Sequence, residues 1–240
     1  MSVSALYFNS MKKKLVVLTG AGISAESGIK TFRDSDGLWE GHDVMEVASP
    51  EGWRNNPALV MDFYNKRRQQ LKEVVPNAAH LILAELEQHF HVHIITQNVD
   101  DLHERAGSSN VLHLHGELLK ARSTKRENYI LDWTDDLNFG DLDDNGHQLR
   151  PHIVWFGEAV PALEEAVSIT NEADFFAVVG TSLQVYPAAG LVDFAKPGTP
   201  LFYVDLNPAR IPNLRNELEV IPTTASEGMK LLKEKLLARL

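Results

Sequence analysis

The chain has 240 residues, of which 44% are apolar and 23% are charged. This balance excludes a disordered or fibrous protein and leaves enough chain to bury a hydrophobic core. The 33 Asp and Glu outnumber the 23 Lys and Arg, so the formal charge of −10 argues against tight non-specific binding to nucleic acid. Cysteine is absent, which excludes disulfides, thiol nucleophiles, iron–sulfur clusters and any cysteine-ligated zinc site.

The N-terminal segment predicts neither a membrane anchor nor a secretion signal. The sequence holds no apolar run near the ~20 residues that cross a bilayer. Residues 1–10 lack a basic leader followed by an apolar stretch, so we expect a cytoplasmic protein in which they form a flexible extension. The alternative is that the native chain starts at Met11, directly before Lys12.

Short apolar runs alternate with helical patterns along the chain. The runs that read as buried strands are residues 15–18, 93–96, 111–114, 175–179 and 200–204. The segments with helical spacing are residues 58–71, 77–90, 162–170 and 226–240. This alternation predicts an α/β fold with a parallel sheet and helices on both faces.

Two stretches break the alternation. Residues 42–75 look helical with no intervening strand, and residues 122–150 are polar, rich in Asp and marked by an Asn145-Gly146 turn signal. We interpret both as insertions that form a smaller lobe. The larger domain then consists of residues 11–41, 76–121 and 151–240.

A glycine-rich loop follows the first predicted strand. Gly20 permits a tight turn, Gly22 lets backbone N–H groups approach a phosphate, and a helix N-terminus expected just after them would add a positive dipole. Gly28 comes later than the third glycine of the usual dinucleotide fingerprint, so a plain strand–turn–helix junction is an alternative. A simple dehydrogenase is disfavoured, because no strand ending in an acidic residue follows about 20 residues on.

Polar side chains follow the later strands, at the sheet edge where ligands bind. Gln97, Asn98 and Asp100 offer donors and acceptors that a carboxamide such as nicotinamide would satisfy, although helix capping by Asn98 or Asp100 is an alternative. His115 precedes a glycine and is predicted to be a general base acting on a sugar hydroxyl. His103 and His113 are expected to be structural.

Together these motifs resemble the sirtuin family of NAD-dependent protein deacylases. The resemblance spans residues 13–240, and its blocks occur in the family's order. They are residues 20–24 with 27–29 and 32–33, 96–100 with 102–103, 115–117, 154–158, 180–182 and 206–208.

The resemblance implies a Rossmann-like NAD-binding domain beside the small domain, with acyl-lysine proteins or peptides as partners and no nucleic acid or membrane. The NAD-binding residues would be Gly20, Ala21, Gly22, Phe32, Arg33, Gln97, Asn98, Asp100, Gly180, Thr181, Ser182, Asn207 and Ser226. His115, Asn98 and Asp100 would be catalytic, and the products would be nicotinamide, free lysine and O-acyl-ADP-ribose. The peptide would pair as an added strand with Val154, Phe156, Gly157 and Glu158.

The sequence departs from the family at its zinc module. Sirtuins usually carry four zinc-binding cysteines after the catalytic histidine, whereas residues 122–150 hold none and Ser123 stands where the first is expected. His147 with carboxylates is a poor tetrahedral site, so we expect no metal. A small apolar cluster is predicted to order this lobe instead, formed by Tyr129, Leu131, Trp133 and Phe139.

One helical pair bears on the acyl group. Tyr64 and Arg67 lie three residues apart, on one helix face, and resemble the Tyr-x-x-Arg pair of the bacterial desuccinylase-like sirtuins that accept succinyl- or malonyl-lysine. An arginine beside a hydroxyl binds a terminal carboxylate well. The alternative is a basic helix face, because Lys66 and Arg68 flank the arginine.

Two other functions remain open at this point. One is an NAD or ADP-ribose sensor that has lost turnover, which the presence of His115, Asn98 and Asp100 disfavours. The other is mono-ADP-ribosyl transfer to protein as a side activity, since it shares the first chemical step.

Overall fold

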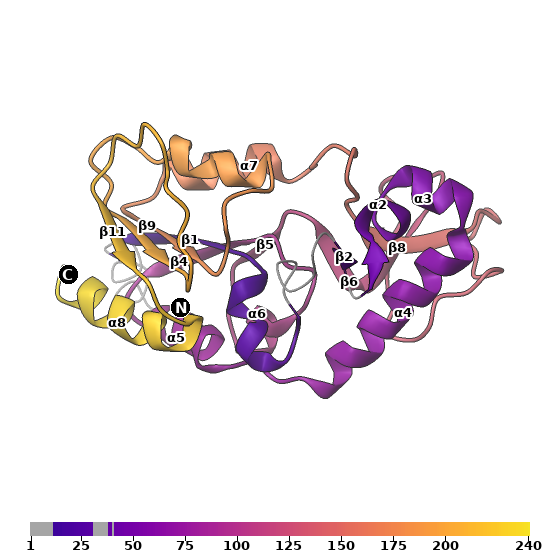
Figure 1. Cartoon of the computed structure of the whole chain (residues 1–240), viewed down its shortest axis with the longest axis horizontal. Coiled ribbons are helices and arrows are strands. Elements are labelled where there is room, and N and C mark those ends of the chain that lie inside the picture. The colour runs from indigo at the N-terminus through magenta and orange to yellow at the C-terminus, as the bar shows by residue number, and fades with distance from the viewer. Residues whose placement is uncertain (1–11, 31–37, 40) are drawn as a thin grey trace, which may run out of the picture.

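The computed structural model describes residues 12–30, 38–39 and 41–240. The predicted extension at residues 1–10 and the site residues Phe32 and Arg33 lie outside these ranges. Figure 1 shows two lobes side by side, a larger one built on a sheet with helices above and below it and a smaller one beside its edge.

The larger lobe is built on six parallel strands. Their bounds are Lys14–Thr19 (β1), His91–Thr96 (β4), Val111–His113 (β5), Phe175–Val179 (β9), Leu201–Val204 (β10) and Leu218–Ile221 (β11). In the described part of the chain the order across the sheet is β11-β10-β9-β1-β4-β5, with all neighbours parallel. The predicted α/β class is confirmed, and so are the five predicted strands. β11 was missed because it is a short, half-buried edge strand with a charged residue in it.

Helices cover both faces of this sheet (Figure 1). Their bounds are Ala78–Leu86 (α5), Leu163–Asn171 (α7), Ala188–Phe194 (η3, a 3-10 helix) and Ala225–Leu237 (α8). In β1, Leu15 and Val17 pack against α5 and α8, whereas Val16 and Leu18 pack on the other face with α7 and η3. Because successive strand residues point to opposite faces, a strand buried on both sides must be apolar throughout. This explains the uninterrupted Leu15–Leu18 run.

The smaller lobe combines helices with a three-stranded antiparallel sheet. Its helices and hairpin are Leu38–Trp39 (β2), His42–Asp43 (β3), Val44–Val47 (α2), Pro50–Asn55 (α3) and Pro57–Glu73 (α4). Its sheet has the order β7-β6-β8, with bounds Ile130–Asp132 (β7), Gly116–Ser123 (β6) and Leu149–Ile153 (β8). The domain limits drawn from the sequence at residues 121 and 150 fall inside β6 and β8, so these two strands connect the lobes.

The Asp-rich segment packs on a small apolar cluster. Ala121, Leu137 and Leu149 are its buried residues, and Tyr129, Leu131 and Trp133 pack around them. The prediction was wrong for Phe139, whose side chain lies on the surface and is 60% exposed. Leu137 and Leu149 are buried in its place. The sequence did not indicate them, because the hydrophobic pattern of this loop has no regular period. In the residues described, none of the helices is long and apolar enough to cross a membrane.

Candidate active site

The glycine-rich loop leaves the carboxyl end of β1 and does not start an α-helix. Residues after Gly20 form two 3-10 turns, Ala21–Ile23 (η1) and Ala25–Ser27 (η2), and end at Gly28 with a positive φ of 97°. The expected helix N-terminus at this position was therefore wrong. The buried side chain of Ser24, between the two turns, is held by contacts to a neighbouring strand end, which fixes the chain in tighter turns.

The loop lies against the end of β9 with almost no space between the two backbones. The amide of Gly22 donates to the carbonyl of Gly180 at 2.8 Å. A Cβ on Gly22 would come within 2.7 Å of Gly180 Cα, and a Cβ on Gly180 would lie 2.2 Å from the nitrogen of Ile23. Glycine is required on both sides of this approach. The predicted residues Gly20, Ala21, Gly22, Gly180 and Thr181 are thereby brought together.

The side chain of Gln97 joins this group from the end of β4. Its Nε2 donates to Thr181 Oγ1 at 3.1 Å, and its backbone amide donates to Thr19 at 2.9 Å. Three parallel strands, β4, β1 and β9, thus bring their polar ends to one edge of the sheet. This is the edge at which open α/β sheets bind ligands.

Ser24 is the centre of a buried polar network. Its Oγ accepts a hydrogen bond from Asn98 Nδ2 at 3.1 Å and donates to Asp100 Oδ2 at 3.0 Å, with His80 Nε2 at 3.4 Å. These four side chains are 0 to 7% exposed. The network holds the amide of Asn98 and the carboxylate of Asp100 in fixed orientations beside the loop. Helix capping, the alternative role considered for Asn98, does not explain its position, because its side chain donates to Ser24.

The carboxyl group of Asp100 is in an unusual environment. Burial raises its pKa to about 6, although hydrogen bonds from the backbone of Leu102 and from Ser24 oppose the shift. Its Oδ1 accepts from the amide of Leu102 at 3.2 Å, at the first residue of helix Leu102–Arg105 (α6). Capping therefore accounts for one of its oxygens, and the other serves the network around Ser24.

His115 lies between β5 and β6, on the loop that links the two lobes. Its Nδ1 is 3.1 Å from the carbonyl of Gln97. A carbonyl only accepts, so Nδ1 carries the proton in the neutral ring and Nε2 is left as a proton acceptor. Burial lowers the pKa of His115, against the effect of the bond to Gln97, which favours the neutral form near pH 7.

His113 has a structural role, in line with the sequence analysis. Its Nδ1 lies 2.9 Å from the carbonyl of Asn98 and its Nε2 lies 2.9 Å from Glu104 Oε1. Burial alone would lower the pKa of His113, but the bond to Glu104 raises it. Two acceptors suit a doubly protonated ring, which fixes the backbone of Asn98. His103 is fully buried, with Nε2 at 3.1 Å from Thr19 Oγ1.

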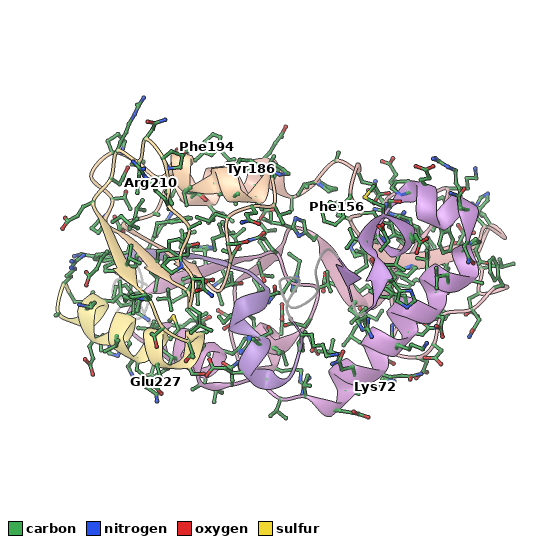
Figure 2. All side chains as sticks on the ribbon, viewed as in Figure 1. Lys72, Phe156, Tyr186, Phe194, Arg210 and Glu227 are labelled. Atoms are coloured by element: carbon green, nitrogen blue, oxygen red, sulfur yellow. The ribbon has the colours of Figure 1, made fainter. Side chains whose placement is uncertain are left out.

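The segment after β8 carries the predicted peptide-binding residues. The amide of Val154 donates to the carbonyl of His115 at 2.9 Å, and the amide of Phe156 donates to Ala48 at 2.9 Å. Phe156 is 39% exposed and lies where the two lobes meet (Figure 2). Gly157 has a positive φ of 90°, which turns the chain sharply. The segment therefore runs beside the proposed base, from one lobe to the other.

Glu158 is fully occupied within the chain. Its Oε1 accepts from Arg122 at 3.1 Å and from Arg150 at 2.8 Å, and its Oε2 accepts from Arg150 and from the amide of Trp155, both at 2.9 Å. Its side chain holds the 154–158 segment in shape, whatever the peptide contacts.

Tyr64 and Arg67 lie on α4, on its inner face. Tyr64 is fully buried, and the guanidinium of Arg67 lies 4.7 Å over the ring of Phe63. The neighbouring cations point elsewhere. Lys66 forms a surface ion pair on the same helix, and the fully buried Arg68 donates to a β6 carbonyl at 3.1 Å. A continuous basic helix face does not form.

Three of the predicted cofactor residues lie further from this centre. Ser182 follows Thr181 and is half-buried, and Asn207 is exposed just beyond β10, two strands from β1. Ser226 is the second residue of α8, where its amide donates to Glu26 Oε2 at 2.8 Å and so connects this helix to the glycine loop. Their positions extend the candidate site along the carboxyl edge of the sheet, from β1 to β10 and the start of α8.

The smaller lobe does not fit the zinc ion that the family usually holds. Ser123 Oγ donates to the buried Asp143 carboxylate at 2.7 Å, and the amides of Asn145 and His147 donate to its other oxygen at 2.9 Å. Burial alone would raise the pKa of Asp143, but hydrogen bonds from Ser123 and His147 hold it well below its usual range. Among the described residues no three metal-ligating side chains converge. The carboxylate of Asp143 organises this loop.

Sequence reasoning missed several residues of the site. Ser24 stands inside the glycine motif, and its one signal is a polar residue in a tightly packed turn. His80 comes from α5, 56 residues along the chain from Ser24, with no local signal. Trp155 and Arg150 were missed because they act through contacts with α4 and with Glu158, which only the fold brings together.

Comparison with known proteins agrees with this geometry. The sequence profile of the Sir2 family matches residues 20–187. An NAD-dependent protein deacylase of Helicobacter pylori is 60% identical over 225 residues, which cover 94% of this chain and 98% of that protein. One from Bacteroides thetaiotaomicron is 52% identical over 231 residues, with the same coverages.

Two solved structures extend the likeness to three dimensions. The crystal structure of a Sir2 homolog–NAD complex is 38% identical with a TM-score of 0.83, covering 100% of this chain and 95% of that one. A Sir2 complex with a deacetylated p53 peptide and 3′-O-acetyl ADP ribose is 30% identical with a TM-score of 0.77, covering 97% of each chain.

Proposed function

Because the chain belongs to the Sir2 family and is an NAD-dependent protein deacylase, we propose that it removes succinyl and malonyl as well as acetyl groups from lysine side chains. One water is consumed as the lysine is freed, nicotinamide is released and the acyl group passes to ADP-ribose. The observation that carries the proposal is the position of His115. Its Nδ1 is bonded to the carbonyl of Gln97, directly before Asn98, which leaves Nε2 as the proton acceptor, and its own carbonyl accepts from Val154 in the segment proposed to bind the peptide.

The residues at the carboxyl edge fit NAD. Gly20, Gly22 and Gly180 leave no room for a Cβ, and their amides donate to the carbonyls of Val179, Gly180 and Val204. These glycines therefore allow the close packing of the loop against β9, beside which the phosphates would lie. Gln97 and Asn98 hold amide groups and Asp100 a carboxyl group, the donors and acceptors that a nicotinamide carboxamide needs. We assign Thr181, Ser182, Asn207 and Ser226 to the adenosine half. Phe32 and Arg33, proposed to line the nicotinamide side, lie outside the described residues.

Each polar residue has a task in the reaction. When bound, NAD supplies an electrophilic ribose carbon as nicotinamide leaves and a hydroxyl that takes over the acyl group. Asn98 and Asp100, fixed by Ser24, orient the ribose and nicotinamide. His115 takes the proton of the ribose hydroxyl at Nε2 and keeps its ring orientation through Gln97. Val154 and Phe156 would limit the access of bulk water, which would otherwise hydrolyse NAD before the acyl group reacts.

The acyl preference is assigned to Tyr64 and Arg67. Both lie on the inner face of α4, and Tyr64 is bonded to the segment that follows Val154. An arginine fork with a phenol donor recognises a terminal carboxylate, which succinyl and malonyl groups carry and acetyl lacks. The separate directions of Lys66 and Arg68 support a specific role for Arg67 over a general basic surface.

The test follows both acyl groups on one peptide. Purified protein is incubated with matched acetyl- and succinyl-lysine peptides, with and without NAD, and the products are measured by mass spectrometry. NAD-dependent loss of succinyl with formation of O-succinyl-ADP-ribose is expected. Binding of NAD without any product on either peptide would instead support a sensor.

A pair of variants tests the acyl pocket. Arg67→Met should lower the succinyl-to-acetyl ratio of kcat/KM by at least about tenfold, because a hydrogen-bonded charge pair is lost. Lys66→Met is the matched control, since it removes a neighbouring charge whose partner is on the surface. An unchanged ratio in Arg67→Met would refute the carboxylate role.

A further inference from the structure

The indole of Trp155 forms a buried contact with Tyr64 that the proposed function does not use. Trp155 Nε1 donates to the hydroxyl oxygen of Tyr64 at 3.2 Å. The two residues come from different parts of the chain, Tyr64 from α4 and Trp155 from the segment beyond β8, and both are at most 2% exposed. A hydrogen bond between two residues this deeply buried is made in a low-dielectric environment, where its geometry is well defined.

Trp155 itself is held on two sides by charged residues. The guanidinium of Arg150 lies 3.7 Å over its ring, and the backbone amide of Trp155 donates to Glu158. Arg150 also binds both oxygens of Glu158 and thereby closes a ring of contacts with Trp155. Trp53 packs against the same indole at 5.7 Å. The orientation of the indole N–H is therefore fixed before any substrate binds.

The contact determines what the Tyr64 hydroxyl can do. With one lone pair occupied by the indole N–H, its own proton is turned to the opposite side of the phenol. Burial raises the pKa of Tyr64 well above its ordinary value, against the opposing effects of Trp155 and nearby arginines. The phenol therefore stays protonated and keeps a donor aimed away from Trp155. A carboxylate, which only accepts, is the group that such a donor suits.

We propose that Trp155, clamped by Arg150 and Glu158, is a positioning residue that sets the acyl preference by holding the Tyr64 hydroxyl as a hydrogen-bond donor to the acyl carboxylate. The inference rests on the proposed function, because it acts on the same acyl pocket. The new element is the positioning role of Trp155, Arg150 and Glu158, which act on Tyr64 and need no contact of their own with the acyl group or NAD.

The decisive variant is Trp155→Phe, which keeps a ring and removes the N–H donor. For the succinyl peptide, kcat/KM should fall about tenfold, mostly through KM, while for the acetyl peptide it should change by less than about twofold. In a Tyr64→Phe background, Trp155→Phe should cause no further shift of the ratio, since its action passes through the lost hydroxyl.

Trp53→Phe is the matched control. It makes the same replacement in the same core cluster and keeps an aromatic ring against the Trp155 indole, so the contacts that fix Trp155 are retained. Within the described residues it removes no hydrogen bond of the Trp53 indole N–H. Its succinyl-to-acetyl ratio should equal that of the original protein. An equal shift in Trp53→Phe, an unchanged ratio in Trp155→Phe, or a full additional effect on Tyr64→Phe would each overturn the inference.

If Trp155→Phe does not fold, Arg150→Lys carries the test. Lysine keeps the charge for Glu158 but loses the flat stack on the indole, so the ratio should fall in the same direction, and an unchanged ratio overturns the inference. These variants distinguish failure of the acyl pocket at Tyr64 and Arg67 from failure of the positioning role of Trp155. If Arg67→Met and Tyr64→Phe shift the ratio while the Trp155 and Arg150 variants do not, only the positioning role fails. If none of them shifts it, the acyl pocket fails as well.

Discussion

Replacing Asp100 with asparagine should change how the stability of the protein depends on pH. The pKa of Asp100 in the fold is about 6, against an ordinary value of 3.8. A carboxyl group with a raised pKa prefers its protonated form in the folded state. The stability it contributes is therefore fully present below about pH 3.8 and is lost as the pH rises through about 6.

The size of the effect follows from the shift. About two pKa units correspond to roughly 3 kcal/mol at a pH above both values, and roughly 2 kcal/mol of this is lost between about pH 4 and pH 7. Asparagine has no charge to bury and no such loss. It also disturbs the hydrogen bonds from Ser24 and Leu102, but that cost is the same at both pH values. Relative to the original protein, Asp100→Asn should therefore gain roughly 2 kcal/mol on going from about pH 4 to pH 7.

Urea unfolding at the two pH values, followed by tryptophan fluorescence, measures this difference. The control is Asp135→Asn, because the Asp135 side chain is 91% exposed and its paired charge is screened by solvent. If the difference in unfolding free energy between Asp100→Asn and the original protein were the same at both pH values, the reasoning about the buried carboxyl would be refuted.

Three further predictions concern the base, the loop and the smaller lobe. His115→Ala should lower kcat by about 10²- to 10⁴-fold with little change in NAD affinity, and full activity would remove His115 from the role of base. Gly22→Ala should weaken NAD binding measured by calorimetry, because its Cβ would come within 2.7 Å of Gly180 and force the two strand ends apart; unchanged affinity would contradict this. Asp143→Asn should lower the melting temperature, whereas EDTA should leave that of the original protein unchanged, and a drop with EDTA would point to a bound metal.

The main sheet was predictable because its strands are apolar on both faces. Residues 15–18 and 175–179 show this in the sequence as unbroken apolar runs, which follow from burial on two sides. The strands of the smaller lobe were missed because they are not buried on both faces and therefore show no unbroken apolar run. β6 has the sequence Gly-Glu-Leu-Leu-Lys-Ala-Arg-Ser, in which buried residues are mixed with partly buried polar ones, so it carries no apolar run and no clean alternation.

The parts of the candidate site that were predictable are those that lie close together in the sequence. Gln97, Asn98 and Asp100 follow one strand, and their polarity at the end of an apolar run indicates a ligand edge. The helix expected after Gly22 was wrong, because Ser24 is bonded to Asn98 and Asp100 instead of leading into regular helix. Contacts of this kind span more than 70 residues of chain, and no local pattern encodes them.

The hydrogen bonds around Asp143 determine which chemical groups the order of this loop depends on. A zinc–thiolate module ties folding to metal supply and leaves sulfur open to oxidation and metal exchange. Here a carboxylate gathers donors from Ser123, Asn145 and His147, all supplied by the chain itself. These hydrogen bonds need neither zinc nor cysteine sulfur. Protonation of that one carboxylate would remove the acceptor on which the loop is built, and because its pKa is held well below the usual range, this happens only in strong acid.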